Sequence, residues 1–237
     1  MSKKHLMFGI ALTIAFFGVL GAMVSPIWDG KNFMEYADDL FNTFSKGSVY
    51  FIPKVSEKAE KYVGKELKVT IKMKDSSEAE KTALLYSKAG VDVDVSGNVI
   101  TISGDLGKIL KSALADADAM YKNEGKTLYE KYGYNEKEAM YYWWVSLKKI
   151  ANDYKKSSNK DKINAGIFIE KEIVTRAIEP AYNYYGIEAK NIGEEAIIAA
   201  GLLVFYVVYT LWWGFAIYNL FVGLGLRMEK AKEKKEV

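Results

Sequence analysis

Two long stretches without a charged residue constrain this chain more than any other feature of its sequence. No charge occurs from Leu6 to Trp28, and none occurs from Ala196 to Leu226. A helix needs about 20 mostly apolar residues to cross the hydrocarbon core of a bilayer, and both stretches reach that length. The sequence between them is rich in Lys and Glu, as in a water-soluble domain. We therefore predict an integral membrane protein with two transmembrane helices, residues 6–28 and 196–226, and a folded domain between them.

The first stretch has an alternative interpretation as a cleaved signal peptide. The apolar core of such a peptide usually has about 7–15 residues and ends at a site of the A-x-A kind. The core here is longer, and residues 21–24 (Gly-Ala-Met-Val) do not match such a site, so we expect an uncleaved anchor. The second stretch is longer than a bilayer core requires. It must tilt, or one of its ends must project from the membrane.

Basic residues flank both stretches on the sides that face away from the central sequence. Lys3 and Lys4 precede the first stretch, and Arg227 and the lysines of residues 228–237 follow the second. Lys and Arg accumulate on the cytoplasmic side of membrane proteins. We therefore predict a protein of the cell (inner) membrane, with residues 1–5 and the basic tail, residues 227–237, in the cytoplasm. Residues 29–195 are then extracytoplasmic, in the periplasm of a cell that has two membranes.

Composition excludes several kinds of chemistry. Cysteine is absent and His5 is the only histidine, so disulfides, thiolate sites, zinc sites and Ser-His or Cys-His nucleophiles have no residues to build them. The net charge is only +3, and no basic face indicates a nucleic-acid partner. We expect no metal site and no cofactor, and we predict that the chain is not an enzyme.

Hydrophobic periodicity divides the central sequence into three parts: a helical segment (29–64), an α+β subdomain (65–124) and a helical subdomain (125–195). The α+β part begins with an alternating strand at 67–73. Ser77 and Glu80 form a capping box that opens a helix, and Gly90 closes it. A hairpin at 91–103 and a helix at 106–123 follow. This strand–helix–hairpin–helix order predicts a small three-stranded sheet with helices on one face, an α+β fold with additional helices.

The hairpin is the clearest local pattern in the chain. Around Gly97-Asn98, Val and Ile alternate with polar residues, and a two-residue turn there places Val95 opposite Ile100 and Val93 opposite Ile102. The hairpin and the helix after it, to about Asn123, resemble the BON domain, a small extracytoplasmic α+β module with a similar alternating pattern. The resemblance is confined to this segment, and we take no function from it.

Acidic residues in this part have two interpretations. Asp92, Asp94 and Ser96, followed by Gly97, match the start of a calcium-binding EF-hand loop, in which alternate residues supply oxygen ligands. Ser103 stands where that loop needs a bidentate Glu, so a plain hairpin is the preferred interpretation. Asp116 and Asp118 are two residues apart on a helix and point about 200° apart, and we expect both to be solvated.

Two helices are expected in the helical subdomain. The first is capped by Asn135 and carries an apolar stripe that includes Trp143 and Trp144. Its helical spacing favours core packing, although these rings could also stack on a sugar. The second helix runs from about Asp161 to Glu179 and is expected to stop at Pro180. The three tyrosines that follow, Tyr182, Tyr184 and Tyr185, indicate an aromatic belt near the membrane.

The two spans contain no ionisable group that would indicate an ion or proton pathway. Their glycines permit close approach of another helix, and aromatic and polar side chains gather in the middle of the second span. The residues that we predict to pack against helices or partners are Gly18, Gly21, Tyr206, Tyr209, Trp212, Trp213 and Asn219.

Three functions follow from these patterns. The first is a non-catalytic accessory or scaffold subunit that assembles with other membrane protein subunits, or with itself, in the lipid bilayer. The second is an extracytoplasmic ligand-binding or sensory domain that signals through a partner protein. The third is a cell-envelope enzyme that depends on carboxylates, for which no particular pair of Asp or Glu stands out.

Overall fold

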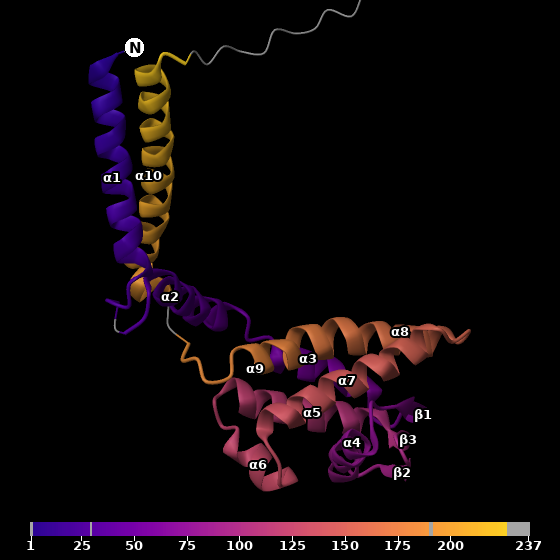
Figure 1. The fold of residues 1–237 in the computed structure, drawn as a ribbon. Coiled ribbons are helices and arrows are strands. Elements are labelled where there is room, and N and C mark those ends of the chain that lie inside the picture. Colours follow the sequence, from indigo (N-terminus) through magenta and orange to yellow (C-terminus); the bar gives the residue numbers. More distant parts are fainter. Residues whose placement is uncertain (1, 29, 190–191, 227–237) are drawn as a thin grey trace, which may run out of the picture. The chain divides into compact units, whose positions relative to one another are not determined.

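The computed structural model describes residues 2–28, 30–189 and 192–226, which form two compact units (Figure 1). One unit contains the described residues of Met1–Phe41 and Asn191–Val237, and the other contains Asn42–Lys190. We call them the helix-pair unit and the domain.

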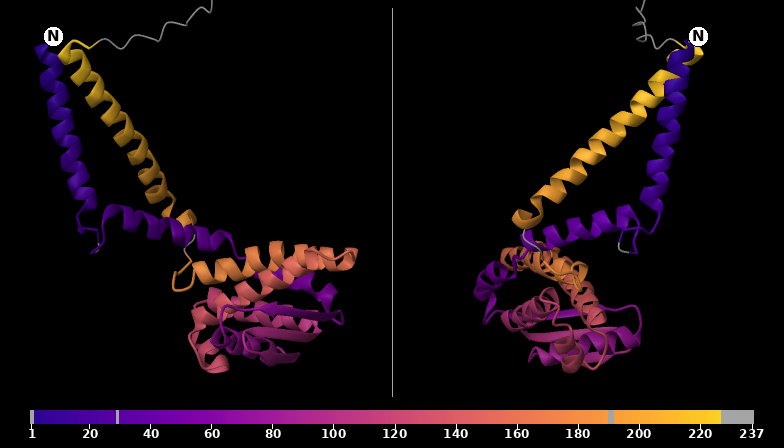
Figure 2. Two further views of the ribbon diagram at one scale, coloured as in Figure 1. Left: turned by 45° about the vertical axis from the view of Figure 1, so that its right-hand side comes forward. Right: turned by 90° about the vertical axis from the view of Figure 1, so that its left-hand side faces the viewer.

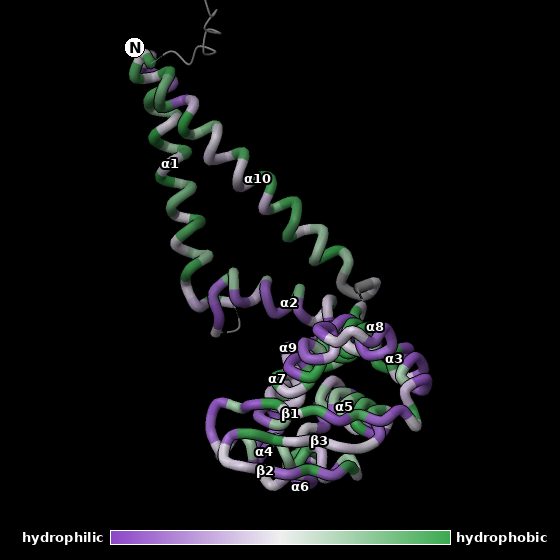
Figure 3. The backbone as a smooth tube through the Cα atoms, turned by 90° about the vertical axis from the view of Figure 1, so that its right-hand side faces the viewer, coloured by the Kyte–Doolittle hydropathy of each residue, from purple (hydrophilic) through white to green (hydrophobic). Residues whose placement is uncertain are grey.

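The helix-pair unit is built from α1 (Lys3–Val24), α10 (Ile192–Leu224) and the first part of α2 (Phe33–Ser48). Lys3–Val24 and Ala196–Leu224 are long and apolar enough to cross a membrane, and both are coloured mainly as hydrophobic in Figure 3. Only 6% and 0% of their most apolar stretches are buried, whereas the core helix of a soluble protein is mostly buried. The two predicted apolar helices are therefore present, and they lie with most of their side chains uncovered.

The domain contains a three-stranded antiparallel sheet with strand order β1-β3-β2. Its strands are β1 (Glu66–Lys72), β2 (Asp92–Ser96) and β3 (Val99–Asp105). Val95 pairs with Ile100 and Val93 with Ile102, which confirms the predicted hairpin and its register. Exposed and buried residues alternate along β1, so one face of the sheet is covered.

Helices cover that face. α4 (Ser76–Lys88) contacts β2 and β3, and α7 (Glu136–Lys155) contacts β1. Leu67, Ile100, Ile102 and Trp143 are fully buried in the resulting core. The remaining elements of the domain are α3 (Ile52–Ala59), the 3₁₀ turn η1 (Glu60–Tyr62), α5 (Leu106–Tyr121), α6 (Lys126–Tyr132), α8 (Lys160–Phe168), the π-helical η2 (Ile169–Ile178) and α9 (Glu179–Asn183).

The start of α4 differs from the predicted capping box. Asp75, rather than Ser77, is the N-cap residue, and its side chain accepts a hydrogen bond from Glu78 N. Glu78 Oε2 in turn accepts from Lys74 N, one residue before the N-cap, so residues 74, 75 and 78 form a variant of the capping box. The box is displaced because β1 ends at Lys72 and leaves Asp75 in the extended conformation that an N-cap requires.

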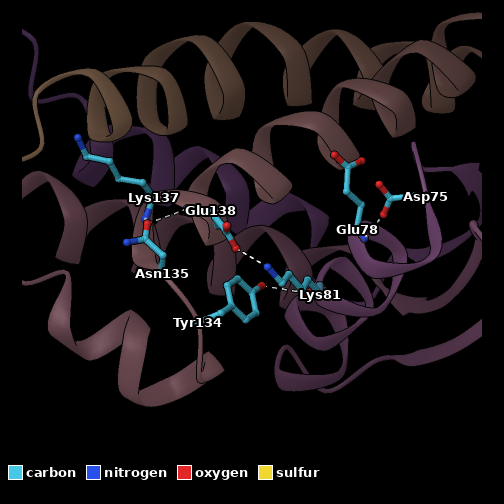
Figure 4. A network of polar contacts seen from close by, with 7 residues as sticks. All are labelled: Asp75, Glu78, Lys81, Tyr134, Asn135, Lys137 and Glu138. Carbon is cyan, nitrogen blue, oxygen red and sulfur yellow. Dashed lines mark hydrogen bonds and ion pairs between the residues drawn. The ribbon is translucent and has the colours of Figure 1, made fainter.

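A polar network joins α4 to the start of α7 (Figure 4). Lys81 Nζ lies 2.6 Å from Glu138 Oε2, and Tyr134 OH donates to the backbone oxygen of Lys81 at 2.9 Å. Asn135 caps α7 as predicted, because its Oδ1 accepts from Lys137 N and Glu138 N. The capping residues thus also position the ion pair between the two helices.

The last helix of the domain does not stop at Pro180. α8, η2 and α9 follow one another without a break from Lys160 to Asn183. At the end of the π-helical segment, Glu179 N still donates to Val174 O, five residues back. Pro180 follows in the first turn of α9. In a regular α-helix its ring would clash with the carbonyl four residues back, and a π-helical turn is wide enough to relieve that clash. The change of helix type lets the chain pass the proline and extend to Asn183.

Candidate functional site: paired helices and an aromatic pocket

Side chains of α10 bind the backbone of α1 in the helix-pair unit. Tyr209 OH donates to Phe16 O at 3.1 Å, and Trp212 Nε1 donates to Leu12 O at 3.1 Å. In a regular α-helix, both of these carbonyl oxygens also accept a hydrogen bond from the N–H four residues further along. The predicted interface residues Tyr209 and Trp212 therefore contact the protein's own first helix.

The Phe16 ring fills the space between two rings of α10. It is stacked on Tyr209, with centroids 4.2 Å apart, and lies 4.6 Å from Trp213. Nearer the other end of the contact, His5 Nδ1 and Asn219 Oδ1 are 2.8 Å apart. Phe16 and His5 were not among the residues predicted to pack against another helix, because neither belongs to a spacing pattern in the sequence.

Glycines set how closely the two helices approach. A Cβ atom added at Gly223 would lie 2.6 Å from Leu6 Cα, and one at Gly9 would lie 2.7 Å from Leu220 N. Gly18 and Gly21, which the sequence favoured for packing, have no neighbouring atom within 4 Å of that position. Tyr206 is 69% exposed. These three residues take no part in the contact between α1 and α10, and their role toward a partner stays a prediction.

The domain holds one buried carboxylate among its described residues. Asp116 is 4% exposed, so the expectation that it is solvated is wrong. Its Oδ1 accepts from Lys131 Nζ at 2.8 Å, and its Oδ2 accepts from Trp143 Nε1 at 2.8 Å and from Tyr132 OH. Helical spacing correctly predicted that Asp116 and Asp118 point to different sides of α5. It could not show which side faces the core. With its neighbours bonded in this way, Asp116 acts as a structural anchor for α6 and α7.

Lys46 is a second buried charge, 3% exposed. Its ammonium donates to Asn123 Oδ1 and to the backbone oxygens of Tyr184 and Ile187. Burial lowers the pKa of Lys46, and the Coulombic attraction of Glu188 opposes this shift. A hollow of about 570 Å³ lies beside it, but the three hydrogen bonds already direct the ammonium group to the end of α9. The lysine therefore binds the backbone of the segment that follows α9, at the oxygens of Tyr184 and Ile187.

A pocket of about 400 Å³ lies between α7 and the helix formed by η2 and α9. On α7, Tyr141 and Trp144 are three residues apart and so share one helix face. On the opposite side, Ile178, Glu179, Tyr182 and Asn183 complete the lining. Trp143, next in sequence to Trp144, points into the core and is fully buried, as its position in the apolar stripe predicted. Trp144 instead lines the pocket.

Two residues of the pocket lining form a polar contact. Trp144 Nε1 donates to Glu179 Oε1 at 2.9 Å, which fixes the orientation of both side chains. The Tyr141 and Trp144 rings are stacked with centroids 6.1 Å apart. Lys148 Nζ lies 4.3 Å from the centre of the Trp144 ring. The site combines aromatic faces with one carboxylate and one nearby ammonium group.

The residues of the calcium-loop pattern lie on the sheet. Asp92, Asp94 and Ser96 belong to β2, where Asp94 pairs with Thr101 and Ser96 with Val99, so this segment is a strand rather than a loop. Across residues 2–28, 30–189 and 192–226, no group of three or more His, Cys, Asp or Glu side chains is arranged to hold a metal ion.

Comparison of the chain with protein families, with curated proteins and with solved structures found no match.

Proposed function

We propose that this chain is a two-pass membrane protein that acts as a non-catalytic accessory or scaffold subunit. α1 and α10 cross the cell (inner) membrane, both termini lie in the cytoplasm, and the domain lies outside, in the periplasm. The observation that carries this proposal is the uncovered apolar surface of both helices. Lipid and the helices of other subunits, or of a second copy, cover that surface.

The uncovered surface includes positions suited to helix packing. Outside the contact between α1 and α10, large apolar side chains are exposed on both helices: Met7, Ile14, Ile197, Leu203, Val204 and Phe215. Gly18 and Gly21 on α1 and Gly201 and Gly214 on α10 have open space where a side chain would lie. Because small residues allow two backbones to approach closely in a membrane, these positions support a partner helix.

Purification of the full chain from native membranes in a mild detergent tests this function. We expect a homo-oligomer or a co-purifying membrane protein, and we expect Gly18→Ile combined with Gly21→Ile to release it. The volume-conserving change Ile14→Leu is the matched control and leaves the complex intact. A monomer with no co-purifying protein contradicts the proposal.

A second candidate function, a ligand-binding domain that reports to a partner, is favoured by the pocket at Trp144 and Glu179. Its volume lies within the range of small-molecule sites, and its lining combines aromatic and aliphatic side chains with a few polar groups, as in such sites. Thermal unfolding of the full chain in lipid nanodiscs, screened against sugars, amines, amino acids and nucleotides, tests it. Stabilisation by one ligand class supports this function, and no stabilisation by any class contradicts it.

A further inference from the structure

We propose that the pocket lined by Tyr141, Trp144, Glu179, Tyr182 and Asn183 binds an uncharged saccharide. This inference rests on the ligand-binding function proposed above and names its ligand class. The ring of a sugar has an apolar face of C–H groups and an edge of hydroxyl groups. A site for it needs flat aromatic surfaces beside hydrogen-bonding groups, and the pocket has both.

The aromatic part is supplied from two helices. Tyr141 and Trp144 of α7 form a stacked pair, and Tyr182 of α9 lines the pocket from the other side. Tyr141 is 43% exposed and Tyr182 is 41% exposed, so both rings retain surface that a ligand can cover. Aromatic rings offer large contact area with little conformational freedom to lose. They therefore suit a rigid ligand such as a pyranose ring.

The polar part is already oriented. Glu179 uses Oε1 to accept from Trp144 Nε1, and an ionised carboxylate has about four lone-pair positions. The remaining positions can accept hydrogen bonds from sugar hydroxyls, and such bonds to a charged group are stronger than neutral ones. Asn183 adds an amide, which both donates and accepts. A hydroxyl group also donates and accepts, so it can use each of these partners.

The charges of the site favour a neutral ligand. An aromatic pocket with a carboxylate also suits an ammonium ion, since cations are attracted to ring faces. Here Lys148 Nζ already lies 4.3 Å from the centre of the Trp144 ring, and it would repel a second cation on that ring. Glu179 would likewise repel an anionic ligand. A saccharide without charge is repelled neither by Lys148 nor by Glu179.

Binding to the full chain in lipid nanodiscs tests the proposal, because sugar-based detergents would compete for the pocket. The probes are cellotetraose and tetra-N-acetylchitotetraose as uncharged saccharides and choline as a cation, each titrated by calorimetry. We expect at least one saccharide to bind. We expect Tyr182→Ala and Glu179→Gln each to weaken its binding about tenfold, which corresponds to about 1.4 kcal/mol.

Tyr129→Ala is the matched control, since Tyr129 is an exposed tyrosine of α6 outside the pocket. We expect this variant to bind the saccharide with unchanged affinity. Near-UV circular dichroism verifies that each variant is folded. Binding that neither Tyr182→Ala nor Glu179→Gln weakens overturns the location of the site. Binding of choline without either saccharide overturns the ligand class but leaves a ligand-binding domain. If neither probe type binds, the saccharide proposal is overturned, and the thermal screen above decides separately whether the ligand-binding function falls with it.

Discussion

Asp116 illustrates how this domain keeps a charge in its interior. Its carboxylate is surrounded by the ammonium of Lys131, the hydroxyl of Tyr132 and the indole N–H of Trp143. A buried ion is tolerated when its partners are close and its remaining hydrogen-bonding positions are used. Burial and the charge of Asp116 raise the pKa of Tyr132, which keeps that hydroxyl protonated as a donor.

Removing this carboxylate should destabilise the domain far more than removing its neighbour in sequence. Asp116→Ala leaves three donors without their acceptor, and we expect a loss of about 2–4 kcal/mol in the free energy of unfolding. Asp118 pairs with Lys122 and accepts from Tyr50 OH, both near the surface, so Asp118→Ala serves as the control and should cost less than about 1 kcal/mol. Urea unfolding followed by near-UV circular dichroism measures both. Equal losses in the two variants would show that Asp116 is not an anchor.

Tyr121 makes the domain less stable at alkaline pH. Its hydroxyl donates to the backbone oxygen of Lys46, and burial, aided by the nearby Tyr184 and Tyr50, raises the pKa of Tyr121 to about 12. In an unfolded chain a tyrosine titrates near pH 10. Between these two values the folded state holds a proton that the unfolded state has lost. Stability is therefore fully present below about pH 10 and falls as the pH rises toward 12.

We expect Tyr121→Phe to reduce this alkaline loss. Between pH 9 and pH 11, the free energy of unfolding of the unmodified protein should fall by about 1 kcal/mol more than that of the variant. The comparison removes the titration of Lys46, which both proteins contain. Urea titrations at the two pH values measure the difference, with Tyr129→Phe as an exposed-tyrosine control that keeps the full loss. A variant with an undiminished slope would exclude Tyr121 as the titrating group.

At the scale of elements, the hairpin was predictable because everything that defines it is local. The turn at Gly97-Asn98 and the alternation on either side determine the register, which pairs Val95 with Ile100. The start of α4 was harder, since residues 75–78 and residues 77–80 both have a capping pattern. Only the position at which β1 ends selects Asp75 as the N-cap.

The pocket could not be predicted from local patterns. Trp144 and Glu179 are separated by 35 positions, and their contact depends on how α7 packs against η2 and α9. The continuation of the last helix past Pro180 also depends on the π-helical segment, which has no simple sequence signal. Helical periodicity did identify Trp143 as a core residue, because its stripe is repeated along the whole of α7.

The contact between α1 and α10 leads to a prediction for that helix pair. A side chain at Gly223 would overlap the backbone of Leu6, so Gly223→Val should separate the helices. The chain has no cysteine, and His5→Cys with Asn219→Cys introduces a pair at positions now joined by a hydrogen bond. We expect Gly223→Val to lower oxidative crosslinking of this pair severalfold. Gly214→Val, at an open position, is the control; if it lowers crosslinking equally, the close contact at Gly223 does not hold the pair together.

At the scale of the whole molecule, the domain holds its two chain ends together. Lys46 lies just after the domain begins at Asn42, and Tyr184 and Ile187 lie just before it ends at Lys190. The Lys46 ammonium and the Asn123 side chain both bind this last segment, and Asn123 Oδ1 also accepts from Gly186 N. The proposed two-pass topology requires a domain whose two ends lie close together, and these contacts hold the first and last segments of the domain to each other.

The proposed topology places Ser2 and Ser158 on opposite sides of the membrane. Ser158 is exposed in the turn before α8, and Ser2 directly precedes α1. Because the chain has no cysteine, Ser158→Cys and Ser2→Cys each supply a single labelling site. In cells with a permeabilised outer membrane, a membrane-impermeant maleimide should label Ser158→Cys at once and Ser2→Cys only after detergent opens the inner membrane. The reverse pattern would invert the orientation, and labelling of both sites before detergent would contradict the placement of the termini opposite the domain.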